Sequence, residues 1–160
     1  MIYTCPSTGM NQSSADKPCY YTTGSDGNIW TGPMGGCTCA IVLGRKREGR
    51  YSVICGQHGA GGIKAINFAG LMDELQAPNV RETLIYLMWS VGNNQSYKSE
   101  VCGKLREMHK EKLLGKVQFC VFYQFECNGS ARVNEDGSFY NVMEPSTPQK
   151  PQHTFSLWLD

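Results

Sequence analysis

The sequence predicts a single α+β domain in which a mixed or largely antiparallel, sandwich-like β-sheet is covered by two or three helices. Three observations predict this fold class. The chain has 160 residues, 41% of them hydrophobic, which suffices for one core. Short apolar runs bounded by turn-forming residues indicate strands, and between the first and last of these runs lie segments with a helical period. We therefore treat residues 1–160 as one domain.

The first half of the chain predicts one β-hairpin after a loop-rich start. Residues 1–29 contain many turn formers and no helical period, so we expect loop there, with one short strand at most. The apolar runs 37–43 and 50–55 predict two buried strands. The charged segment 44–49 between them is bounded by glycines, which favours a hairpin connection. A glycine-rich loop, 56–62, follows.

Three helices are predicted after this hairpin, at 63–75, at 79–91 and at about 97–114. The second has Pro78 near its first turn and one apolar face. The residues of that face are Val80, Leu84, Leu87, Met88 and Val91.

The last part of the chain predicts three more strands. They lie at 117–126, 139–143 and 154–159, with turns at 128–129 and 136–137 and a proline-containing surface connection at 145–151.

Charge and hydropathy exclude several classes of partner. The 15 basic and 14 acidic side chains nearly cancel, so nothing indicates binding to nucleic acid or to an anionic membrane. No apolar run approaches the roughly 18 residues of a membrane span, and Met1 to Met10 lack the regions of a Sec signal peptide. We expect a monomer whose partner is a protein or a small molecule.

The eight cysteines are expected to be mostly reduced. Several lie in apolar, strand-like runs, where a free cysteine behaves as a small hydrophobe. Cys5 and Cys19, in the polar N-terminal segment, are the one pair that a disulfide would suit.

A cysteine nucleophile needs a neighbouring base, and the hairpin provides one. If the connection is centred between Arg47 and Glu48, residue 37 lies opposite residue 58. Cys37 then faces His58, since opposed residues have Cβ atoms about 4.5 to 5.5 Å apart. The same register puts Cys39 on the face of Cys37 and Cys55 on the other face.

The residues around this pair fit a catalytic site. Gly35 and Gly36 leave backbone amides accessible to an oxyanion just before Cys37. Thr31 and Gln57 offer polar support. A group of Thr31 that holds the far nitrogen of His58 would fix the tautomer in which the near nitrogen accepts the thiol proton.

The segment of residues 31–62 resembles a known family. Thr31-Gly-Pro-Met-Gly-Gly-Cys37-Thr38, followed by two strands and a histidine in a glycine-rich loop, is similar to the deamidase superfamily of cytotoxic necrotizing factor, Burkholderia lethal factor and the chemoreceptor deamidase CheD. The likeness is strongest to the Leu-Ser-Gly-Cys-Thr stretch of the lethal factor, where Met34-Gly35 stand here for Leu-Ser. The resemblance implies Cys37 as nucleophile, His58 as base and Thr31 as the orienting group.

The resemblance implies hydrolysis of a glutamine side-chain amide in a target protein, through a thioester on Cys37 and without metal or cofactor. It implies a bacterial toxin or effector, secreted without a Sec signal peptide, that acts on a host protein in the host cytoplasm. A role like that of CheD in the bacterial cytoplasm is the alternative.

Two other functions use the same residues. Cys37, Cys39, Cys55 and His58 supply ligand types that zinc accepts in an interaction module, although the predicted register turns Cys55 away and the spacing of the first two cysteines is tight. A papain-like cysteine peptidase, an amidase or a transglutaminase would use the same cysteine and histidine. Those folds usually place the cysteine on a helix, whereas the residues after Cys37 favour a strand. His109 and His153 lie among polar residues and are expected to be solvated.

Overall fold

The computed structural model describes most of the chain. The described residues are 2–14, 16–34, 36–44, 46–47, 49–51, 54–74, 82–90, 97–110, 116–125, 129–141 and 146–158. The strands are β1 (Ile2–Met10), β2 (Gln12–Ser13), β3 (Tyr20–Met34), β4 (Thr38–Leu43), β5 (Lys46–Arg47), β6 (Arg50–Tyr51), β7 (Ile54–Gly59), β8 (Glu82–Ser90), β9 (Lys116–Phe125), β10 (Gly129–Asn134), β11 (Phe139–Asn141) and β12 (His153–Trp158). The helices are the short 3₁₀ turn η1 (Ile63–Ala65), α1 (Phe68–Glu74) and α2 (Tyr97–Lys110).

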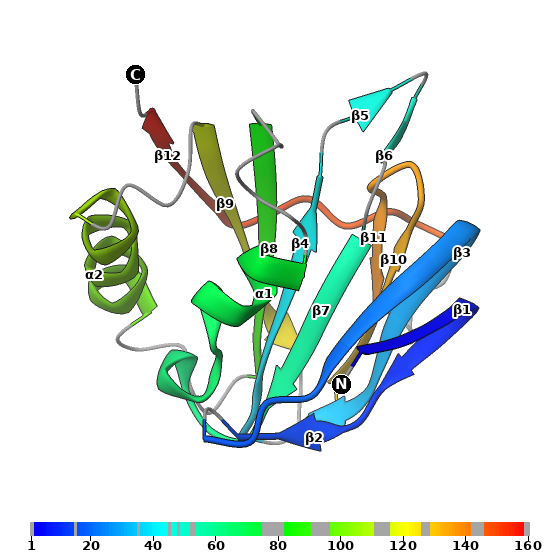
Figure 1. Cartoon of the computed structure of the whole chain (residues 1–160), viewed down its shortest axis with the longest axis horizontal. Helices are drawn as coiled ribbons and strands as arrows, with labels where there is room; N and C mark the ends of the chain where they lie inside the picture. The colour runs from blue at the N-terminus through cyan, green and yellow to red at the C-terminus, as the bar shows by residue number, and fades with distance from the viewer. Residues whose placement is uncertain are drawn as a thin grey trace.

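One mixed sheet forms the body of a single domain. Its main path runs β11-β10-β3-β7-β4-β8-β9-β12, with β1 paired to β3 and β2 paired to β7. The pairs β1/β3, β2/β7 and β8/β9 are parallel, and the other pairs of this sheet are antiparallel. The predicted single domain with a mixed sheet is therefore confirmed. Within the described ranges the helical part is small, with α1 and α2 on one side of the central strands (Figure 1).

Strand β8 replaces the predicted helix at 79–91, so that prediction was wrong for residues 82–90. This strand pairs with β4 on one side and with β9 on the other, so it is a central strand. Its side chains are buried on both faces, as for Ile85 and Leu87 on one face and Met88 on the other. A central strand is apolar at consecutive positions, and such a run also satisfies a helical period.

The N-terminal segment also differs from the prediction. Strands β1 and β2 and much of β3 lie in residues 1–29, which we expected to be mainly loop. The aromatic and β-branched run Tyr20 to Thr23 is typical of a strand and pairs with β7 at Tyr21 and Thr22. The many turn formers nearby favour a loop and so conceal this strand signal.

A hairpin of β4 and β7 is present, but β7 includes residues 56–59, which we expected to be a glycine-rich loop. The register of the hairpin differs from the prediction by two positions. Cys39 pairs with His58, where we expected Cys37. Arg47 pairs with Arg50, which centres the turn one residue later than assumed, and Gly49 occupies it with a φ of 81°. Moving the turn by one residue moves each partner by two, and side chains alternate with period two, so the predicted faces are retained.

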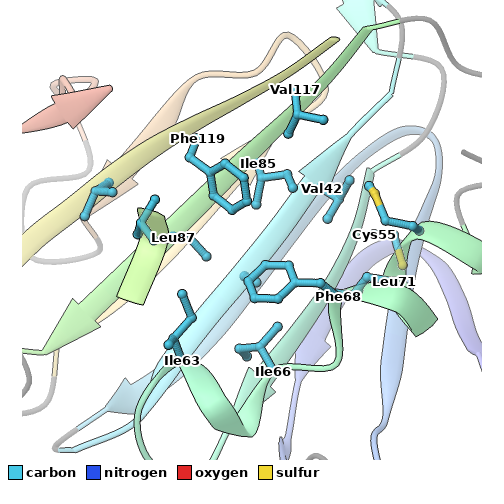
Figure 2. Packing of buried hydrophobic residues seen from close by; sticks show 14 of the residues in the cluster. Val42, Cys55, Ile63, Ile66, Phe68, Leu71, Ile85, Leu87, Val117 and Phe119 are labelled. Carbon is cyan, nitrogen blue, oxygen red and sulfur yellow. The ribbon is translucent and has the colours of Figure 1, made fainter. Parts of the chain in front are cut away.

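Two hydrophobic cores lie on the two faces of the central strands. The helix-side core packs α1 and η1 against β4, β8 and β9, with Phe68 and Phe119 in edge-to-face contact at 5.9 Å between centroids (Figure 2). The second core lies between the central strands and β3, β10 and β11. There Phe139 of β11 stacks on Phe122 of β9, with centroids 3.8 Å apart. Strands from the two ends of the sheet therefore meet, which means that the sheet curls over itself.

Most of the remaining elements follow the predictions, but β10 (Gly129–Asn134) is a strand that was not predicted, and Gly129 of the predicted turn begins it. The segment 63–75 is helical but interrupted between η1 and α1, α2 occupies 97–110 of the third predicted helix, and β9, β11 and β12 occupy the three C-terminal strands. Residues 1, 15, 45, 48, 52–53, 75, 79–81, 91, 111–114, 126, 128, 142–143, 145 and 159 of the predicted segments lie outside the described part. Neither described helix has the length and apolarity that a bilayer crossing requires.

Candidate active site

His58 lies near the end of β7 and is almost fully buried, with 5% of its surface exposed. Its ring projects toward the second core, on the same face of β7 as Ile54. The Nδ1 atom lies 2.9 Å from the hydroxyl oxygen of Thr31 on β3. The sequence predicted this partner for His58, and the contact is present.

The environment of Thr31 selects one tautomer of His58. The Thr31 hydroxyl donates its proton to the carbonyl of Gly32 at 3.2 Å, so the same oxygen is left to accept a hydrogen bond. The Nδ1 of His58 is then the protonated nitrogen. The Nε2 atom keeps its lone pair, and it is buried without a hydrogen-bond partner among the described residues. An imidazole held at one nitrogen and unpartnered at the other is suited to accept a proton.

Burial lowers the pKa of His58, because removal from water disfavours the imidazolium. The backbone carbonyl of Met10 acts in the opposite direction and raises this pKa, because a carbonyl oxygen close to the ring favours its protonated form. Met10 is the last residue of β1 and pairs with Thr31, so the two neighbours of the ring stand side by side. Around neutral pH this histidine is expected to be neutral and to act as a base.

Two cysteines share the face of His58. Cys39 is opposite His58 on β4 and is fully buried, and burial raises the pKa of its thiol far above the usual value. Cys37 lies two residues earlier, partly exposed, in the turn that leads into β4. A thiol kept protonated by burial is a poor nucleophile. Cys37 is therefore the candidate nucleophile, diagonal to His58 at a Cβ separation of roughly 7 to 8 Å in regular strands.

The expected supporting residues are only partly found at this site. Gly36 is exposed in the bend before Cys37, and Gly35 lies outside the described residues. Gln57 is fully buried, but its side chain lies on the opposite face of β7 from His58, which corrects the support role we assigned to it. Its amide donates to the Ser13 hydroxyl at 3.1 Å and to the carbonyl of Ala65 at 3.1 Å. Its oxygen accepts a hydrogen bond from the backbone of Asn67 at 2.9 Å. Gln57 therefore links β7 to β2 and to the segment between η1 and α1.

The four candidate zinc ligands do not converge. Cys55 belongs to the helix-side core, whereas Cys39 belongs to the second core and Cys37 packs against it. Burial raises the pKa of Cys55 to about 12, which also opposes the thiolate that zinc requires. In the described part of the chain, no group of three histidine, cysteine or carboxylate side chains is arranged to hold a metal. Cys19 is a free thiol, and the side chain of Cys5, the partner that a disulfide would suit, lies outside the described part.

Sequence reasoning missed two contributors to the site. Met10 reaches His58 through its backbone, and the Ser13 hydroxyl donates to the carbonyl of His58 at 3.4 Å. Both residues lie in the segment 1–29, for which the sequence predicts mainly loop. The β-branched and aromatic residues of that segment were the signal that could have found them.

No protein-family profile and no curated protein matches the sequence of this chain.

Proposed function

We propose that this protein is a cysteine-dependent protein glutamine deamidase, with Cys37 as nucleophile, His58 as base and Thr31 as the residue that orients the base. One observation carries the proposal. The hydrogen bond between Thr31 and Nδ1 leaves a buried, unpartnered Nε2 on the face of the sheet where Cys37 lies. A threonine that holds a histidine beside a cysteine on adjoining strands is the arrangement that the resemblance to the deamidase superfamily implies.

The surrounding fold supports the same proposal. The curled sheet, with its helices on one face, fits the sandwich-like α+β fold that the sequence predicts (Figure 1). Cys37 precedes a strand and not a helix. This position argues against the papain-like alternative, in which the nucleophile stands at a helix.

The residues provide a complete reaction. His58 Nε2 takes the thiol proton, and the Cys37 thiolate attacks the carbon of the glutamine amide. The C–N bond then breaks, and the imidazolium gives its proton to the departing ammonia. Water attacks the resulting thioester with His58 again as base, the C–S bond breaks, and glutamate and the Cys37 thiol are released. We propose that a backbone amide just before β4 donates to the oxyanion. No step requires a metal or a cofactor.

The substrate is proposed to be a glutamine in a folded partner protein, and the setting a bacterial effector that acts in a host cell. Hydrolysis changes a neutral amide into a carboxylate, and this adds one negative charge to the partner. A chemoreceptor-like substrate in the bacterial cytoplasm is the alternative setting, and it uses the same chemistry.

The test compares two cysteines of the same face. Host-cell lysate is incubated with the wild-type protein, with Cys37→Ala and with Cys39→Ala, and glutamine-to-glutamate changes are read by peptide mass spectrometry with ammonia release in parallel. We expect a gain of about one dalton on a specific glutamine, the oxygen-for-nitrogen exchange of amide hydrolysis. Cys37→Ala should abolish it, and Cys39→Ala should retain it.

Other products would reject the deamidase. Cleaved peptides would indicate a peptidase, and glutamine joined to a lysine or another amine would indicate a transglutaminase. Loss of activity with Cys39→Ala and not with Cys37→Ala would show that the buried Cys39 is the nucleophile.

A further inference from the structure

The two-residue strand β2 lies directly beside the proposed base. Gln12 pairs with His58 of β7, and Ser13 pairs with Gly59, the two strands running parallel (Figure 1). Two hydrogen bonds fix the strand there. The backbone N–H of Ala60 donates to the carbonyl of Ser13 at 2.8 Å, and the Ser13 hydroxyl donates to the carbonyl of His58 at 3.4 Å. Gln12 therefore has a defined position next to His58.

The side chain of Gln12 projects to the face of the sheet on which His58 lies. Residues paired in a parallel ladder project to the same face. Ser13 gives an independent observation, because its hydroxyl accepts a hydrogen bond from the Gln57 amide at 3.1 Å. Gln57 pairs with Ala40 of the helix-side core, on the face opposite to His58. Since successive side chains of a strand alternate, Gln12 points to the face of the base.

The strands on the two sides of β7 bring different chemistry to His58. Cys39 of β4 is fully buried, and burial keeps its thiol protonated. Gln12 of β2 is exposed, and its side chain forms no hydrogen bond with another described residue. Its amide therefore offers an acceptor oxygen and two N–H donors to a molecule that arrives from solvent.

The proposed reaction has a use for such a group beside His58. The imidazolium of His58 protonates the departing nitrogen, so this nitrogen must lie within hydrogen-bond reach of Nε2 when the C–N bond breaks. A glutamine amide nitrogen carries two N–H groups, and each needs an acceptor when it leaves water. Neighbouring strands lie about 4.8 Å apart, a distance that an extended glutamine side chain spans, so the Gln12 oxygen can reach the space beside the ring.

We propose that Gln12 is a specificity-determining residue, whose Oε1 atom accepts a hydrogen bond from the amide nitrogen of the substrate glutamine and holds this nitrogen beside His58. The assignment rests on the proposed deamidase function. A peptide-bond nitrogen carries one N–H and a carbon in place of the other. An acceptor at this position therefore favours a primary amide over a peptide bond. Gln12 thereby distinguishes a deamidase from a peptidase that uses the same cysteine and histidine.

Two substitutions of similar size test the acceptor. Gln12→Glu keeps an oxygen that accepts a hydrogen bond, and Gln12→Leu removes it. Each variant is incubated with host-cell lysate at its own pH optimum, and initial rates of glutamine-to-glutamate conversion are read by peptide mass spectrometry. We expect Gln12→Leu to lower the rate about tenfold, and Gln12→Glu to stay within about threefold of the wild type. Gln152→Leu, which replaces an exposed glutamine before β12, is the matched control and should keep the wild-type rate.

The ester p-nitrophenyl acetate separates this role from damage to the site. Its leaving group carries no N–H and departs without a proton, so acylation of Cys37 by this ester needs no acceptor at Gln12. We expect a nitrophenolate burst that depends on Cys37 and is unchanged in Gln12→Leu. Equal losses on the ester and on glutamine would show a merely structural role and overturn the proposal. A tenfold loss with Gln12→Glu as well would mean that Gln12 acts as a donor, and would also overturn it.

The position of Gln12 beside the base is measured without any substrate. A carboxylate within about 6 Å raises the pKa of an imidazole, so the ¹⁵N shifts of His58 should titrate at higher pH in Gln12→Glu than in the wild type. An unchanged titration would show that Gln12 does not face the ring, which overturns the proposal.

The outcomes separate this proposal from the proposed function. A wild-type protein that shows the Cys37-dependent burst but forms no glutamate in the lysate would reject the deamidase, and the role of Gln12 with it. A Cys37-dependent deamidase whose rate is unchanged by Gln12→Leu would reject the role of Gln12 alone.

Discussion

At the residue scale, the contact between Thr31 and His58 accounts for the tautomer of the proposed base. Replacing the hydroxyl by a methyl group, in Thr31→Val, leaves Nδ1 buried without its acceptor. We expect kcat/KM to fall by about tenfold or more, because the ring loses the tautomer that a base requires. The free energy of unfolding should fall by about 1 to 3 kcal/mol.

The ¹⁵N chemical shifts of the His58 imidazole nitrogens distinguish an orienting role of Thr31 from general destabilisation. In the wild type they should report protonation at Nδ1, and in Thr31→Val a mixture of tautomers. Thr31→Ser keeps the hydroxyl and should restore both the shifts and most of the activity. A Thr31→Val protein with the wild-type tautomer and lower activity would contradict the proposed orienting role.

His58 also links stability to pH. Burial lowers its pKa in the folded protein below the unfolded value of 6.5, so the unfolded chain binds the proton more readily. The stabilising contribution is therefore present above pH 6.5 and is lost as the pH falls from there toward the lowered pKa. We expect the free energy of unfolding, measured in urea at a series of pH values, to decrease across this window.

The control is His58→Asn, whose side-chain amide still offers a donor to Thr31 but does not titrate. Its stability should vary less with pH between 6.5 and the lowered pKa than that of the wild type. Identical pH profiles of the two proteins would show that His58 is not the group responsible.

At the scale of single elements, β7 depends on a glycine. A Cβ atom at Gly56 would lie 2.5 Å from the Met10 sulfur and 3.2 Å from the carbonyl oxygen of Ala40, so the strand could not keep Met10 beside the base. We expect Gly56→Ala to lower the free energy of unfolding by about 1 to 3 kcal/mol, measured by urea denaturation.

Gly103 provides the matched control in α2. A Cβ atom there meets nothing within 4 Å, and alanine favours the helix by about 0.5 to 1 kcal/mol over glycine. Gly103→Ala should therefore stabilise the protein. If Gly56→Ala and Gly103→Ala changed the free energy of unfolding in the same direction, the close approach of Met10 to β7 would not limit stability.

At the scale of the whole molecule, the stack of Phe139 on Phe122 joins strands from the two ends of the sheet. Phe139→Ala removes a ring that is 2% exposed, and we expect a loss of about 3 to 5 kcal/mol in the free energy of unfolding. The next residue, Tyr140, faces outward, and Tyr140→Ala should cost only about 0.5 to 1 kcal/mol through its lost contact with Arg132. A small effect of Phe139→Ala would mean that the curl of the sheet does not depend on this stack.

The sequence by itself determined the local features of this protein. The strands β4 and β9, the helix α2 and the pairing of β4 with β7 follow from apolar periodicity and from a glycine-bounded turn. The sequence also predicted on which face of the sheet Cys37, Cys39 and Cys55 lie, because a register shift of two residues leaves every side chain on the same face. Only the tertiary structure decided that residues 82–90 form a central strand. A strand that is buried on both faces is apolar at consecutive positions, so it lacks the alternation by which a strand is told from a helix.

The tertiary structure alone also brought Met10 and Ser13 to His58 and set Trp30 beside Arg132 and Tyr140. These contacts join segments that are far apart in the chain. No local pattern encodes them, because they arise from the order in which strands pair and from the curl of the sheet. Cys37 and His58 were within reach of sequence reasoning because one short hairpin joins them, whereas the contacts of Met10 and Ser13 with His58 required the folded sheet.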